Sequence, residues 1–158
     1  MADDNGGFIP ATLVAHHPSR LVLSLEQCRD VIRFWADRLR LSDWVIEVAM
    51  DRGYDMGAAL GSVTWSLTRK RASITVCDPQ DHDPGRDPVD MEHVLVHELL
   101  HIHFAAWRDW SLEDEKRFES FANTICMEQP IECLSWVLLT MRRSNMELRG
   151  GVMSWEKP

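Results

Sequence analysis

The segment from His97 to His101 carries two imidazoles and a carboxylate at a spacing that could hold and use a metal ion. Residues four positions apart on a helix share one face, so His97 and His101 can direct their rings to one point. Glu98 follows the first histidine and can reach a water bound to the same metal. A metal with imidazole ligands, an open position and a neighbouring carboxylate base is suited to amide hydrolysis. The segment therefore predicts a hydrolytic metal site, with Zn²⁺ as the expected ion.

The flanking residues predict the helix that such a site requires. Residues 89–107 have apolar side chains at helical spacing, and five are expected to face the core: Val94, Leu95, Leu99, Ile102 and Ala106. Two histidines of an amphipathic helix can also be ordinary packed or surface residues, but Glu98 in its place favours the metal site. His93, one turn before His97, would either flank the cleft or be exposed.

A zinc site of this kind needs a third protein ligand. No histidine lies beyond His103, which is two residues after His101 and points off the metal face of a helix. The third ligand is therefore expected to be a carboxylate or a cysteine. The acidic residues considered for this role are Glu113, Asp114, Glu115, Glu119 and Glu128.

With Glu119 as that ligand, the segment from Glu119 to Asn123 resembles the gluzincin branch of the zincin metallopeptidases. In that branch a glutamate on the helix after the motif is the third ligand, and an aspartate one turn later orients a zinc-bound histidine. The resemblance implies that Glu119 binds the metal. Glu115 on the same predicted helix is the alternative, because the site needs a third ligand. Asn123 would take the orienting role with an amide in place of a charge. Residues 21–130 also look like small metallopeptidases of phages and prophages.

The resemblance implies a zinc-dependent peptidase of a minimal zincin-like fold. His97, His101 and Glu119 would hold Zn²⁺, which lowers the pKa of its bound water. Glu98 would act as the general base and then deliver the proton to the leaving amine. The strand nearest the motif helix, residues 72–77, would bind a peptide or protein substrate through its main chain. Candidates to stabilise the oxyanion are Tyr54, Arg142 and Arg143.

The remainder of the chain predicts a single α+β domain over residues 21–149. Residues 1–20 are expected to form a flexible arm, because they are rich in Gly, Pro and Asp, and residues 150–158 a frayed tail. Ser24 is expected to cap a helix that runs to about Leu39. Its apolar stripe would contain Cys28, Val31, Ile32, Trp35 and Leu39.

Three strands are predicted between this helix and the motif helix, in a small and mainly antiparallel sheet. Residues 41–50 begin as a turn and become a strand, and residues 59–68 and 72–77 form two more. The basic segment 69–71 would join these two as a hairpin.

Two helices are predicted after the motif helix, over residues 111–126 and 131–148. The second is expected to pack four apolar residues inward: Leu134, Val137, Leu138 and Met141.

Charge and cysteine content bear on the class of protein. The 158-residue chain has a net charge of −8, which argues against nucleic-acid binding through a basic surface. A metal-dependent RNA hydrolase would also need a third histidine after the motif. The four cysteines, Cys28, Cys77, Cys126 and Cys133, form no Cys-x-x-Cys pair and suit reduced, buried thiols.

Neither a signal peptide nor an apolar stretch long enough to cross a membrane is recognisable, so a cytoplasmic location is expected, in the host cell if a phage encodes the protein. A zincin scaffold kept for regulation or interaction, without turnover, is the alternative from a different class.

Overall fold

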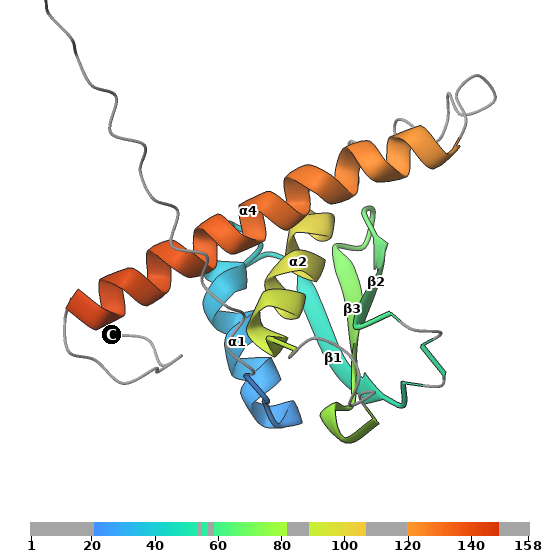
Figure 1. Cartoon of the computed structure of the whole chain (residues 1–158). Coiled ribbons are helices and arrows are strands. Elements are labelled where there is room, and N and C mark those ends of the chain that lie inside the picture. The colour runs from blue at the N-terminus through green and yellow to red at the C-terminus, as the bar shows by residue number, and fades with distance from the viewer. Residues whose placement is uncertain (1–20, 54, 57–58, 82–88, 107–119, 149–158) are drawn as a thin grey trace, which may run out of the picture.

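The computed structural model describes residues 21–53, 55–56, 59–81, 89–106 and 120–148 (Figure 1). These residues form an α+β structure with three α-helices, a three-stranded sheet and one turn of 3-10 helix, Pro79–Asp81. The predicted arm, the predicted tail and most of the predicted helix over 111–126 lie outside the described residues.

Helix α1, Leu25–Arg38, begins where the sequence predicts. The Ser24 hydroxyl accepts a hydrogen bond from the main-chain N–H of Gln27, and the Gln27 side chain accepts one from the N–H of Ser24. At the other end, Arg40 adopts a φ of 59°, and the N–H of Leu41 reaches back to the carbonyl of Ala36. The predicted apolar stripe is confirmed, because Cys28, Val31, Ile32 and Trp35 are buried and Leu39 is partly buried.

The sheet is mixed, with strand order β1-β3-β2. Strand β1, Val45–Asp51, runs parallel to β3, Arg71–Cys77, whereas β2, Gly61–Ser66, runs antiparallel to β3. The hairpin between β2 and β3 is confirmed, with Lys70 in its turn at a φ of 46°. The prediction of a mainly antiparallel sheet is wrong. After β1 the chain crosses to the far edge of the sheet and forms β2, and β3 then lies between the two, parallel to β1.

The order of the strands changes which of them can bind a peptide. β3 is hydrogen-bonded along both edges, so residues 72–77 cannot accept an added strand, contrary to the expectation drawn from the resemblance. β2 is an edge strand paired only with β3 among the described strands, and it packs against the motif helix.

The motif helix α2, Met91–His103, lies between the sheet and helix α4 (Figure 1). The side chain of Asp90 caps its first turn by accepting from the N–H of His93. Four of the residues predicted to face the core are buried: Val94, Leu95, Leu99 and Ile102. Ala106 is exposed and Ala105 is buried instead, because α2 ends at His103 and the helical phase is lost beyond it.

Helix α4, Ser120–Leu148, is continuous, so the predicted break between residues 126 and 131 is wrong. Pro130 lies inside it and removes one main-chain donor. Met127 and Ile131 on either side of Pro130 are both buried, and this packing holds the two halves in line.

The inward face of α4 also differs from the prediction. Leu134, Val137 and Met141 are 40%, 52% and 60% exposed, and Leu138 is only partly buried. The buried positions on the helix are instead Ile131, Ser135, Leu139 and Arg142. Cys28 and Cys77 are buried thiols as predicted, but the same prediction is wrong for Cys133, which is exposed on α4.

A buried ionic cluster explains this rotation of α4. Glu92 is fully buried and accepts hydrogen bonds from Trp35 Nε1 at 3.0 Å and Arg142 Nη1 at 2.7 Å. Arg143 pairs with Glu92 at 3.1 Å and with the carboxylate of Asp90 at 2.7 Å. An unpaired buried carboxylate is costly, so α4 turns its arginines rather than its apolar row toward α2. Arg142 and Arg143 therefore serve this cluster, not an oxyanion.

Candidate metal centre

Two imidazoles and a carboxylate converge where α2 and α4 pack together. The Nε2 atoms of His97 and His101 are 3.1 Å apart. The carboxylate of Glu128, on α4, lies 3.1 Å from His97 Nε2 through one oxygen and 3.4 Å from His101 Nε2 through the other. Ligands about 2.0–2.1 Å from a tetrahedral zinc ion lie about 3.3 Å from one another. With one ligand atom taken from each residue, the three atoms lie within 4.8 Å of one another, so the group has the composition of a zinc site and is close enough to share an ion.

The carboxylate in this group is not the one the sequence favoured. Glu119 and Glu115 lie outside the described residues, and around Asn123 the structure describes only the main chain. Of the described residues, His97, His101 and Glu128 form the one group of at least three potential ligand residues close enough to share an ion. Glu128 is one of the acidic residues that the sequence offers for this role. The predicted helices left it in the break between residues 126 and 131, and the continuous α4 is what brings it to the histidines.

Glu132, one turn beyond Glu128, faces the other nitrogen of His97. Its Oε2 lies 3.1 Å from His97 Nδ1, where an imidazole N–H can donate to it. That hydrogen bond selects the tautomer that leaves Nε2 free for a metal. Glu128 and Glu132 are four positions apart, the same spacing as Glu119 and Asn123, but here both residues are glutamates.

Glu98 lies beside the group and is almost completely buried, with 7% of its surface exposed. Burial, and then the negative charge of Glu128, raise the pKa of Glu98 from 4.5 to about 7. The carboxyl can therefore hold a proton near neutral pH, as a group that takes and returns a proton must.

Gly61 explains how β2 comes so close to Glu98. A Cβ atom at position 61 would lie 2.6 Å from Val94 Cγ1 and 2.7 Å from Glu98 Oε1. No side chain fits there, so glycine lets the main chain of the edge strand pass directly beside the carboxylate.

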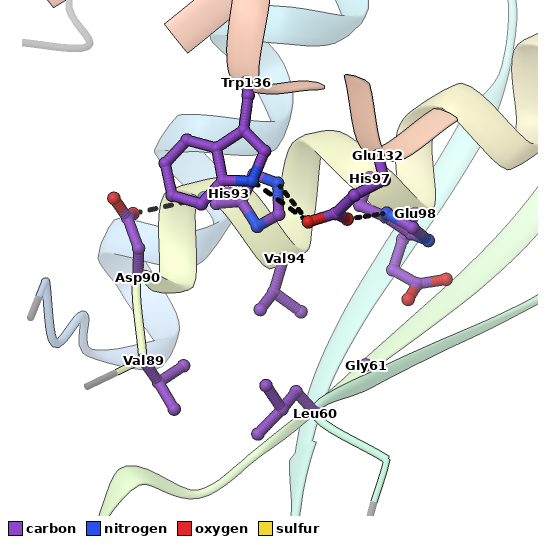
Figure 2. A pocket seen from close by; sticks show the side chains of 10 residues that line it. All are labelled: Leu60, Gly61, Val89, Asp90, His93, Val94, His97, Glu98, Glu132 and Trp136. Atoms are coloured by element: carbon purple, nitrogen blue, oxygen red, sulfur yellow. Dashed lines mark hydrogen bonds and ion pairs between the residues drawn. The ribbon is translucent and has the colours of Figure 1, made fainter. Parts of the chain in front are cut away.

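A cavity of about 440 Å³ opens next to His97 and Glu98 (Figure 2). Its apolar walls come from Leu60, Val89, Val94 and Trp136. Trp136 is stacked on His93 (Figure 2). The ring centroids are 4.0 Å apart, and the interplanar angle is 19°. Burial lowers the pKa of His93, which favours its neutral form. His93 thus lines the cleft and is not exposed, which is one of the two alternatives that the sequence left open.

Compared with protein-family models, curated proteins and solved structures, the chain matches none of them. None of the described helices, α4 included, has the length and apolar character needed to cross a bilayer. Tyr54, the remaining candidate for oxyanion stabilisation, lies outside the described residues.

Proposed function

We propose that this protein is a zinc-dependent metallopeptidase in which His97, His101 and Glu128 hold the metal. The observation that carries the proposal is the approach of the Glu128 carboxylate to both Nε2 atoms, at 3.1 and 3.4 Å. Two imidazoles and a carboxylate are a ligand set of catalytic zinc, which leaves a fourth position for water or substrate.

Glu98 is the general base and acid of the proposed reaction. Zinc, when bound, would lower the pKa of a water molecule and polarise the carbonyl oxygen of the substrate. The Glu98 carboxylate takes a proton from that water and delivers it to the nitrogen of the leaving amine. Its burial keeps bulk water away from the proton while it is held. Glu98 is not needed as a ligand, so binding and chemistry are separable by mutation.

The substrate is an extended peptide that adds to the outer edge of β2. Main-chain hydrogen bonds to an edge strand hold a peptide with little regard to its side chains. Gly61 brings that edge beside Glu98, so a peptide paired there has a bond close to the base. The cavity between Leu60, Val94 and Trp136 would take an apolar side chain next to the scissile bond.

The test compares wild type with Glu128→Gln, Glu98→Gln and the distant control Glu47→Gln, whose side chain is exposed on β1. Zinc per chain is measured by elemental analysis, and new termini in a peptide-library digest are counted by mass spectrometry. We expect about one zinc in wild type, Glu98→Gln and the control, and strong loss in Glu128→Gln. Cleavage should survive only in wild type and the control. Absence of zinc from reconstituted wild type would overturn the proposal.

A regulatory or interaction protein built on the same metal site is the second candidate. The exposed apolar row Leu134, Val137 and Met141 on α4 favours it, because such rows mark contact surfaces. The same digest separates the two candidates. Bound zinc with no new termini across a broad library would select the interaction protein.

A further inference from the structure

We infer that Trp136 is a positioning residue for the metal centre. Its indole N–H holds Glu132, and Glu132 in turn holds the ring of His97. The inference rests on the proposed zinc site and adds to it a residue that touches neither the metal nor its ligands.

The contacts form a chain through a single carboxylate. Trp136 Nε1 donates to Glu132 Oε1 at 3.0 Å, and Glu132 Oε2 lies 3.1 Å from His97 Nδ1. Oε1 also lies 3.6 Å from His93 Nε2, a longer contact than the one from the indole, whereas Oε2 faces His97. Glu132 and Trp136 are four positions apart on α4, so they share one helix face.

Glu132 needs such an anchor because half of its side chain is exposed. An exposed glutamate samples several rotamers and exchanges its hydrogen bonds with water, which weakens its hold on an imidazole. The indole N–H selects the one rotamer that also meets His97. Ligand orientation by an outer carboxylate typically changes metal affinity about 10- to 100-fold.

Trp136 is itself held in place from its other side. It stacks on His93, whose Nε2 lies 2.7 Å from Ser135 Oγ. Ser135 is fully buried and donates to the main-chain carbonyl of Glu132 at 2.8 Å. The Ser135 hydroxyl therefore accepts from His93, and this contact fixes the ring on which the indole rests.

Trp136 also lines the cavity beside the metal group (Figure 2). One side chain thus forms a wall of the proposed substrate pocket and supports a metal ligand. A substitution can separate the two roles, because phenylalanine keeps an aromatic wall and the stack on His93 but has no N–H.

The experiment measures the zinc dissociation constant of Trp136→Phe by competition with a chromophoric chelator. We expect zinc to bind about tenfold more weakly than in wild type. Trp44→Phe, at a partly buried tryptophan before β1, is the matched control and should bind zinc as wild type does. The same substitution in a Glu132→Gln background should add no further loss, since the amide has already weakened the contact to His97.

A second measurement needs no metal and leaves Trp136 in place. In Glu132→Gln, the indole N–H resonance of Trp136, assigned by through-bond NMR, should shift and exchange faster with water. An unchanged resonance would overturn the inference. So would a zinc affinity of Trp136→Phe within twofold of wild type. The inference would also fail if Trp136→Phe weakened zinc binding as much in the Glu132→Gln background as it does in wild type. Failure of the proposed function gives a different result, because wild type itself would then bind no zinc, or would bind zinc and produce no new termini.

Discussion

The carboxylate of Glu128 lies 3.1 Å from Nε2 of His97, although the two residues are 31 positions apart in the sequence. They belong to different helices, α4 and α2, and meet because the two helices pack together. Glu128 thus joins two histidines that the sequence alone already places on one helix face.

Zinc affinity should distinguish Glu128 from the carboxylates favoured by sequence. Glu128→Ala removes a ligand, so we expect it to weaken zinc binding at least 100-fold, whereas Glu119→Ala and Glu115→Ala should stay close to wild type. Glu132→Gln should lie between, at about 10- to 100-fold, because it affects only the orientation of His97. Competition titrations give all four values. Weaker zinc binding by Glu119→Ala, with unchanged binding by Glu128→Ala, would show that Glu119 is the third ligand, as the sequence predicts.

Gly61→Ala should reduce cleavage at least tenfold while zinc stays bound. The added methyl would overlap Val94 and Glu98, so β2 or the base must move. Overpacking of this kind costs about 1–3 kcal/mol of stability. Gly53→Ala is the control for crowding away from the base, since its Cβ would lie 3.1 Å from the carbonyl of Asp81 and 3.3 Å from Cys77 Sγ. If Gly61→Ala cleaves at the wild-type rate, the close approach of β2 to Glu98 is not needed for cleavage.

The stability of the metal-free protein should depend on pH through Glu98. Its pKa in the folded state, about 7, exceeds the ordinary value of 4.5, so the folded state binds this proton more tightly. The contribution is fully present below pH 4.5 and is lost as the pH rises through about 7.

Chemical denaturation with a chelator present measures this effect. Between about pH 5 and 8, the stability of wild type relative to Glu98→Gln should fall by on the order of 2 kcal/mol, since glutamine does not titrate. A difference that stays constant over this range would mean that Glu98 titrates normally.

Arg142→Met should destabilise the fold by about 3–5 kcal/mol, because it leaves the buried Glu92 without its closest partner. Zinc affinity should fall as well, since Arg142 helps to set the rotation of α4 that brings Glu128 to His97. Denaturant titration and a zinc competition assay measure the two effects. Arg33→Met, which removes an exposed cation from α1, is the control. Unchanged stability in Arg142→Met would show that packing alone orients α4.

Local patterns in the sequence were sufficient to predict α1 and α2, the two helices that pack on the sheet. Ser24 and Gln27 predict the start of α1, and the apolar spacing from Val94 to Ile102 predicts the buried face of α2. Both signals depend only on neighbours within one or two turns, so tertiary contacts did not alter them. The placement of His97, Glu98 and His101 on one helix followed from the same spacing.

Tertiary structure alone decided the third carboxylate and the peptide-binding edge. The inward face of α4 depends on the pairing of Glu92 with Arg142, 50 positions apart, which outweighs the apolar periodicity of Leu134, Val137 and Met141. The middle position of β3 depends on where the chain crosses after β1, and no local pattern records that crossing. Sequence therefore determined which residues have the chemistry of a metal site, and long-range packing determined which of them meet.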